Sequence, residues 1–387
     1  MERADGDVGQ GSGDGAMNID SLRDELAALR ESIAATLTAE CSRQAVHDFF
    51  DTQRGLDERL WAVAAEQGWL GIGIPEAYGG LALGAHGLDI LYRQLGRNMA
   101  PGAFIPTLAA AQWLADIGTE ALKSSLLPQL IRGGRTFALP LTLEHPPLPL
   151  RNGELSGLTS LLLSARSPSI AIVPAQEDGV RVFALIECGK PDAQFVPADI
   201  WDKTRCVGRL TLSQALPLAL ITERQGSVAA ALRHCLCLAA AGDCVGGARA
   251  LLEQTVEYLK QRVQFGRPLA SFQALKHRCA NLAAAVIQAG EMLDQAVHAT
   301  SDREPSAGMW ACLAKAAAGE TLELVAQECL QLHGGVGFTW EYDCHIFLKR
   351  ALLNRDIAGN AASLRDRAAD YFTAATLGGQ TTAELRL

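Results

Sequence analysis

The feature that most limits the fold of this chain is a change in hydrophobic periodicity near residue 134. Before that point, runs such as SLRDELAALRESIAATL and IPTLAAAQWLADIG repeat their apolar residues with helical spacing. From 134 to 225 the apolar runs are short, as in SIAIVPAQ and GVRVFALIE, and Pro, Gly and Asp-Gly separate them, which is typical of strands. The helical pattern returns from about residue 226. This order predicts an α+β multidomain protein.

Four segments follow from these changes. Residues 1–17 are acidic and rich in Gly, and we expect them to form a disordered lead. Residues 18–133 are expected to form an N-terminal helical domain, 134–225 a small middle β-domain, and 226–387 a C-terminal helical domain. Within the last segment, the paired glycines Gly334 and Gly335 predict that a long helix ends at His333.

The charge balance argues against nucleic acid as a partner. The net charge is -9 and the pI is near 5.4, and no basic stripe is present to neutralise phosphates. We expect no apolar stretch to be long enough to cross a bilayer, and the acidic start does not resemble a secretory signal. The sequence therefore predicts a cytoplasmic protein with no membrane partner.

The ten cysteines are scattered along the chain. The closest set is Cys235 and Cys237, a C-x-C pair on an apolar helical run, whereas a metal site needs paired C-x-x-C elements or added histidines. We therefore expect buried, reduced thiols, which suit a cytosolic protein, and no metal.

A polar and aromatic cluster stands at a break between two helical runs, in the stretch VEYLKQRVQFGRPLASFQALKHR (256–278). Arg262, Gln264, Phe265 and Gln273 crowd around this break in a chain that is otherwise rich in Ala and Leu. One interpretation is an ordinary turn made by Gly and Pro. The other is a ligand site, since a guanidinium offers a rigid fork of donors for phosphate.

Four stretches decide between these interpretations: AEQGWLGIGIPEAYGGLALG (65–84), LGRNMAPGAFIPT (95–107), QRVQFGRPLASFQALKHR (261–278) and QLHGGVGFTWEYDCHIFLKRA (331–351). In this order, with a β-domain between the second and the third, they resemble the acyl-CoA dehydrogenase family. These flavoenzymes desaturate acyl-CoA thioesters. The HGGVGFTWE form resembles a branch that acts on bulky substrates such as steroid side chains, several members of which are obligate heteromers.

The resemblance implies the family fold, with an N-terminal helical domain, a middle β-domain and a C-terminal four-helix bundle. It also implies FAD as the cofactor. Arg262 would pair with the diphosphate, Phe265 would pack on the adenosine half, and Gln273 would supply an amide. The second cofactor motif would let the backbone approach the ligand closely at its glycines. The implied cofactor residues are Arg262, Gln264, Phe265, Gln273, Gln331, Gly334 and Gly335.

The family reaction needs a carboxylate that removes the α-proton, and in most members it stands in a Tyr-Glu-Gly-Thr stretch. Here the matching region reads RALLNRDIAGNAASLRDR, and its nearest acid, Asp356, is better explained as a partner for Arg355. The position that the isovaleryl type uses corresponds to Leu236. Asp243, two turns further along the same helix face, is the remaining candidate base. The alternatives are a buried acid paired with an arginine, Arg233 or Arg249, and an acid within the helix that faces water.

The β-domain also departs from the family pattern. Thr142, Glu144 and Pro146 match part of the first flavin-holding element, but no Gly-Ser-Asp follows, and residues 150–175 contain no Trp for the later Trp-x-Thr/Ser element. The domain is also shortened. The half-site for the isoalloxazine ring is therefore expected to be eroded in this chain.

In the family, FAD lies between subunits, so a chain that keeps the ADP half-site and lacks the ring half-site is expected to work with a related chain. The leading hypothesis is one subunit of an α2β2 acyl-CoA dehydrogenase, with electron-transfer flavoprotein as acceptor by analogy. The alternatives are a homomeric, active enzyme with a divergent β-domain, and a non-catalytic scaffold that stabilises a partner.

Overall fold

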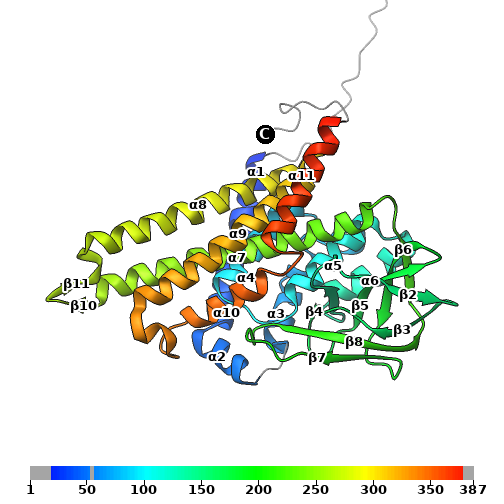
Figure 1. Cartoon of the computed structure of the whole chain (residues 1–387), viewed down its shortest axis with the longest axis horizontal. Coiled ribbons are helices and arrows are strands. Elements are labelled where there is room, and N and C mark those ends of the chain that lie inside the picture. Colours follow the sequence, from blue (N-terminus) through cyan, green and yellow to red (C-terminus); the bar gives the residue numbers. More distant parts are fainter. Residues whose placement is uncertain (1–18, 53–55, 378–387) are drawn as a thin grey trace, which may run out of the picture.

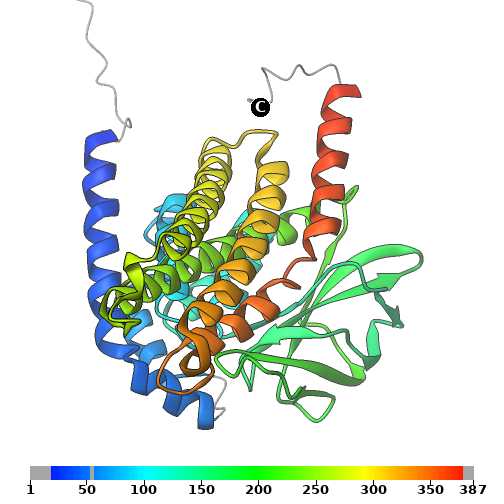
Figure 2. The same ribbon diagram turned by 60° about the vertical axis from the view of Figure 1, so that its left-hand side comes forward.

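The computed structural model describes residues 19–52 and 56–377 (Figure 1). The expected disordered lead, residues 1–17, lies outside the described residues. The described residues have the predicted order of helices, strands and helices. Figure 2 shows the β-domain, in green, lying to one side of the helices.

The N-terminal region is helical, with a Gly- and Pro-rich loop between its third and fourth helices. Asp57 caps α3 by accepting the backbone N–H groups of Arg59 and Leu60. Two 3-10 turns, η1 (Trp69–Gly71) and η2 (Glu76–Tyr78), occupy the loop before α4. The helices are α1 (Ile19–Glu40), α2 (Arg43–Thr52), α3 (Glu58–Glu66), α4 (Gly84–Arg97), α5 (Phe104–Ile117) and α6 (Glu120–Ile131).

The middle region is a β-sandwich whose strands alternate between two cores. In β6, Phe183 and Leu185 join the main core beside the helices, whereas Val182 and Ala184 face a second core between the sheets. β1 bridges the two layers because it pairs with both β4 and β5. The strands are β1 (Phe137–Pro140), β2 (Leu148–Arg151), β3 (Glu154–Leu158), β4 (Leu162–Ser164), β5 (Ile170–Glu177), β6 (Val180–Glu187), β7 (Ala193–Pro197), β8 (Cys206–Ala215) and β9 (Ala219–Thr222).

Three long helices dominate the C-terminal region, and α9 ends at His333, where the paired glycines predicted its end. A short hairpin, β10 (Val263–Gln264) and β11 (Arg267–Pro268), separates α7 from α8. The remaining elements are α7 (Ser227–Gln261), η3 (Leu269–Ser271), α8 (Gln273–Ser301), α9 (Ala307–His333), η4 (Gly334–Phe338), α10 (Cys344–Asn354) and α11 (Ala361–Leu377).

The helix α7 corrects one expectation from the sequence. By length and composition it could cross a membrane, although no stretch of that kind was expected. Within the protein, 89% of its most apolar 18-residue window is buried, which identifies it as a core helix.

Glycines allow α4 and α7 to pack with their backbones almost touching. A Cβ atom on Gly246 would lie 1.9 Å from the carbonyl oxygen of Arg93, and one on Gly96 would lie 2.0 Å from the carbonyl oxygen of Asp243. No side chain fits at either position without moving a helix. This contact fixes α7 against the N-terminal domain.

Candidate functional site

The break between α7 and α8 is a short β-hairpin whose turn consists of two residues. Val263 pairs with Pro268 and Gln264 with Arg267, and the two residues between the strands have positive φ values, +55° at Phe265 and +75° at Gly266. Two consecutive left-handed residues make a type I′ turn, which matches the twist of the flanking strands. Phe265 is nevertheless 88% exposed in a conformation that a bulky residue rarely adopts. The ring of Phe265 is therefore accessible to a ligand or a partner chain.

Arg262 stands immediately before this hairpin as the C-cap of α7. Its backbone N–H donates to the carbonyl oxygen of Tyr258, and the carbonyl of Arg262 accepts the N–H of Leu269, which closes the base of the hairpin. The guanidinium is exposed. Within residues 19–52 and 56–377 it has no ion-pair partner, so it is free to bind an anion.

Gln264 and Gln273 are also exposed on this side of the molecule. Gln273 is the first residue of α8, and its Nε2 lies 3.1 Å from Nε2 of His277 on the next turn. Because both side chains are exposed, either amide can bind a ligand over the hairpin without breaking a buried hydrogen bond.

The second motif begins where α9 ends. Gln331, Gly334 and Gly335 are exposed, and Gly334 has φ +65° and ψ -146°, a conformation that suits only glycine. A Cβ atom on either glycine would meet nothing within 4 Å, so the space above this backbone is open. A ligand can therefore approach the backbone directly.

Aromatic stacking brings the two motifs to one end of the molecule. The rings of Tyr258, one turn before Arg262, and His333, one residue before Gly334, stack with centroids 4.2 Å apart. The hydroxyl of Tyr258 also donates to the carbonyl oxygen of His333 at 3.3 Å. Arg278 on α8 binds Glu328 on α9 at 2.5 Å. In Figure 1 these helix ends and the hairpin form one tip, here named the hairpin tip (residues 258–278 and 331–338).

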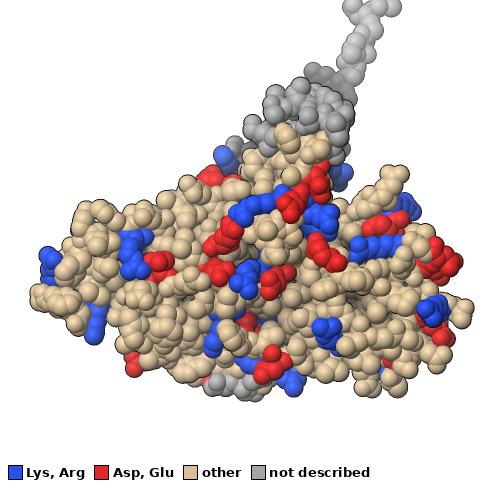
Figure 3. Space-filling model, viewed as in Figure 1, with Lys and Arg blue, Asp and Glu red and all other residues tan. Residues whose placement is uncertain are grey.

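The hairpin tip fits the ADP part of FAD. It presents an unpaired guanidinium for a diphosphate, an exposed aromatic ring for adenine, and open backbone at two glycines. On the face seen in Figure 3, charges of both signs mix over the middle of the molecule, while isolated basic side chains stand on a largely uncharged surface at the tip. Nothing at the tip would repel an anionic ligand strongly.

Asp243 lies elsewhere, in a closed ion-pair cluster. Its carboxylate lies 2.5 Å from Arg350 and 2.8 Å from Arg205, and it accepts a hydrogen bond of 2.7 Å from Nδ2 of Asn354. Arg350 also donates to the carbonyl oxygen of Ala100 at 3.2 Å. All four side chains in this cluster are buried.

This environment opposes the role of Asp243 as a base. Burial alone would raise the pKa of the carboxyl, but Arg205, Arg350 and the hydrogen bonds outweigh it and hold the pKa of Asp243 well below its usual range. A catalytic base needs a raised pKa and a free oxygen beside the substrate. The alternative interpretation, a buried acid paired with arginine, describes the geometry better, although Arg205 and Arg350 replace the expected Arg233 and Arg249. Arg233 instead lies 3.7 Å from Glu144, and Arg249 is exposed.

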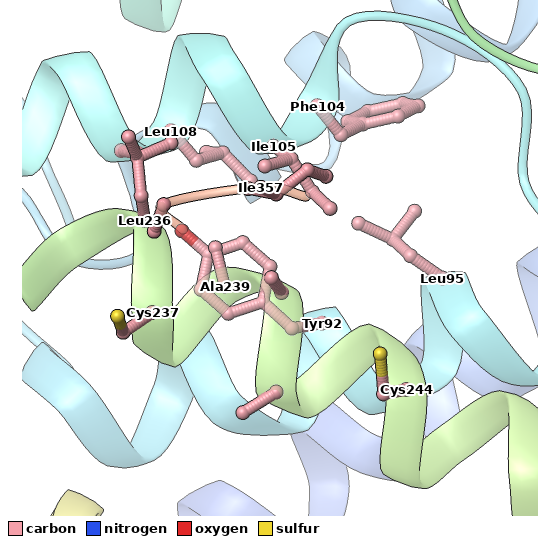
Figure 4. Close-up of a cluster of buried hydrophobic side chains, with 14 of the residues drawn as sticks. Tyr92, Leu95, Phe104, Ile105, Leu108, Leu236, Cys237, Ala239, Cys244 and Ile357 are labelled. Carbon is pink, nitrogen blue, oxygen red and sulfur yellow. The ribbon is translucent and has the colours of Figure 1, made fainter. Parts of the chain in front are cut away.

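Leu236, the position that the isovaleryl type uses, lies in an apolar cluster together with the loop that replaces the Tyr-Glu-Gly-Thr stretch. Leu236 and Ile357 are fully buried with Tyr92, Phe104 and Leu108 around them (Figure 4). The one acid of that loop, Asp356, is half-exposed and lies 3.8 Å from Arg355, the partner expected for it. The region is therefore filled with hydrocarbon.

The remnant of the flavin-ring element makes its contacts within the chain. The hydroxyl of Thr142 donates to the carboxylate of Glu144, and Pro146 is exposed. Among residues 19–52 and 56–377, no group of three or more His, Cys, Asp or Glu side chains is placed to hold a metal ion.

The cluster around Asp243 was not foreseen in full. Arg205 and Arg350 lie in different domains and in segments with no charge pattern that points to α7. A tertiary contact of this kind leaves no periodic signal in a single sequence.

Comparisons with known proteins agree with the fold. Residues 23–134 match the description "Acyl-CoA dehydrogenase, N-terminal domain", and residues 232–371 match "Acyl-CoA dehydrogenase, C-terminal domain". The chain is 31% identical to acyl-CoA dehydrogenase IpdE2 of Mycobacterium tuberculosis, over 84% of this chain and 89% of that protein.

Solved structures share the fold. A variant of the Tcur3481-Tcur3483 steroid ACAD is 27% identical and superposes with a TM-score of 0.83, covering 92% of this chain and 99% of that one. The ChsE4-ChsE5 complex from Mycobacterium tuberculosis gives a TM-score of 0.80 at 22% identity, over 90% of this chain and 97% of that one. The expected resemblance is confirmed, and the chain belongs to the acyl-CoA dehydrogenase family of FAD-dependent oxidoreductases.

Proposed function

We propose that this chain is one subunit of a heteromeric, α2β2 acyl-CoA dehydrogenase and supplies the half of the FAD site that holds the ADP part. One contrast carries the proposal. The seven cofactor residues implied by the family are exposed at the hairpin tip, whereas Leu236 and Ile357 fill the region of the family base with hydrocarbon. A chain built in this way can bind cofactor and needs a second chain for the chemistry.

FAD, when bound, supplies the hydride acceptor for α,β-desaturation of an acyl-CoA thioester. The role of this chain is to bind and orient it. Arg262 neutralises the diphosphate, Phe265 packs against the adenosine half, and Gln264, Gln273 and Gln331 offer amides. The backbone at Gly334 and Gly335 approaches the ligand. The related chain supplies the surface for the isoalloxazine ring and the carboxylate that removes the α-proton.

The substrate we propose is a bulky acyl-CoA of the steroid side-chain type. The similarity to a structure described as a steroid ACAD supports this class, and the ChsE4-ChsE5 complex supports a pairing of two chains. Electron-transfer flavoprotein is the proposed acceptor, and the cytoplasm is the proposed location.

Flavin content tests the proposal. The chain is purified alone, and again after co-expression with the acyl-CoA dehydrogenase genes that lie beside its own gene. The flavin absorbance of each sample is then measured. We expect a colourless lone chain and a yellow complex that holds one FAD for every two chains. One FAD per chain in the lone protein would identify a homomeric enzyme and overturn the proposal.

The residue at the centre of the test is Arg262. Arg262→Ala in the complex removes a charge-assisted contact, so we expect FAD affinity to fall about 10- to 100-fold. Arg132→Ala removes an exposed arginine that follows the last residue of α6 and serves as the matched control. Full flavin retention by the Arg262 variant would favour the scaffold role.

A further inference from the structure

A cavity of about 650 Å³ lies between α4, α5, α7 and the C-terminal end of α8. Its floor is buried and apolar and includes Leu88 and Tyr92, while its rim is exposed at Pro75 and Arg303. A volume of this size is within the range of small-molecule sites, which combine apolar walls with a few converging polar groups.

This cavity is separate from both regions described above. His234, in its wall, lies 28 residues before Arg262 on one helix, a separation of about 42 Å. Tyr92 forms part of its floor and also belongs to the apolar cluster of Figure 4, so this side chain stands between the cavity and that cluster. The cavity reaches solvent through its own rim.

The hydrogen bond between His234 and Thr300 determines which ring nitrogen of His234 carries the hydrogen and which can accept one. Thr300 donates its one hydroxyl hydrogen to the carbonyl oxygen of Ala296 at 2.6 Å, so its Oγ1 can only accept from Nε2 of His234, 3.1 Å away. Burial lowers the pKa of His234 to about 4, and the ring is therefore neutral at neutral pH. With its hydrogen on Nε2, the ring carries a lone pair on Nδ1.

The opposite wall also offers acceptors. Gln112 donates its Nε2 to the carboxylate of Asp116 at 3.0 Å, which fixes the orientation of the amide. Its Oε1 is buried and lies over Gly73 with no hydrogen-bond partner among the described residues. A buried acceptor without a donor is costly, so this atom favours a ligand that brings one.

We propose that this cavity is a second small-molecule site, which binds an uncharged, largely apolar ring compound through its hydroxyl groups. Gln112 Oε1, which has no partner among the described residues, and the neutral ring of His234 are acceptors, and a hydroxyl on the ligand provides the missing hydrogen. Two carboxylates, Asp89 and Asp116, and one guanidinium, Arg303 at the rim, line the same cavity, so its lining is negative on balance and disfavours an anion. Asp89 is held by Arg93 at 2.8 Å, and Asp116 accepts a hydrogen bond from Gln112, so both carboxylates already have a partner within the protein.

The test compares three naphthalene probes on the full chain at neutral pH. 2-Naphthol has the ring and the hydroxyl donor, 2-methoxynaphthalene keeps the oxygen but lacks the hydrogen, and naphthalene-2-sulfonate carries a charge. Titration calorimetry should show saturable binding of 2-naphthol, at least about tenfold weaker binding of the methoxy compound, and no binding of the sulfonate.

Two variants locate the binding. Leu238→Trp fills the cavity from α7 and should abolish 2-naphthol binding, while Ile287→Trp places the same ring on an exposed part of α8 and should leave it unchanged. His234→Phe removes one acceptor at similar size and should narrow the difference between 2-naphthol and its methyl ether. Melting temperatures confirm that each variant folds.

Equal affinity for 2-naphthol and its methyl ether would overturn the proposal. So would an absence of saturable binding, or binding that survives Leu238→Trp in a folded variant. These results are independent of flavin content, because they need neither FAD nor a second chain.

Discussion

At the scale of single residues, Asp243 is held by two buried guanidinium groups and the amide of Asn354. A carboxylate between two buried guanidinium groups balances charge that the low-dielectric interior could not otherwise tolerate. We expect Asp243→Asn to lower the free energy of unfolding by about 3–5 kcal/mol, because it leaves both arginines without their counter-charge. Urea denaturation measures this change.

Asp356→Asn is the control for that variant, since Asp356 is half-exposed, and its effect should stay within about 0.5 kcal/mol. Because the pKa of Asp243 is depressed in the folded state, its contribution is complete at neutral pH and is lost as the pH falls below about 4. If the Asp243→Asn protein were folded and fully stable but had lost turnover, the result would instead support Asp243 as the catalytic base.

At the scale of elements, the contact between α4 and α7 depends on residues without side chains. Gly246→Ala would push a methyl group against the backbone of Arg93, and we expect it to cost about 1–3 kcal/mol of stability. Gly319→Ala is the matched control, because its Cβ would meet nothing within 4 Å in the middle of α9 and should stabilise that helix by up to about 1 kcal/mol. Equal effects of the two variants in thermal unfolding would show that the close contact is unimportant.

At the hairpin tip, the sequence pattern predicts only part of the local structure. The Gly and Pro around residue 266 predict a break between α7 and α8, because both residues disrupt helices. They do not predict paired strands, since the I′ turn requires Phe265 to accept a positive φ that its side chain disfavours. The helix end at His333 was predictable because the paired glycines act locally.

At the scale of the whole molecule, the order of the three regions was predictable because strands and helices repeat their apolar residues with different periods. The cofactor residues were found through motifs that are continuous in sequence. The Asp243 cluster and the α4–α8 cavity were not found, because each is assembled from segments far apart in the chain. The apolar helix α7 was identified as core only once its burial was known.

The Asp243 cluster also has a consequence for how the molecule comes apart. Through Arg205, Arg350 and the carbonyl of Ala100, one carboxylate connects the β-domain, the C-terminal helices and the N-terminal helices. Opening the β-domain would take Arg205 away from its counter-charge, and opening the N-terminal helices would remove the carbonyl that Arg350 binds, so the three regions should melt together. Calorimetry should then give a single transition whose calorimetric and van't Hoff enthalpies agree, and two resolved transitions would mean that the domains are thermodynamically independent.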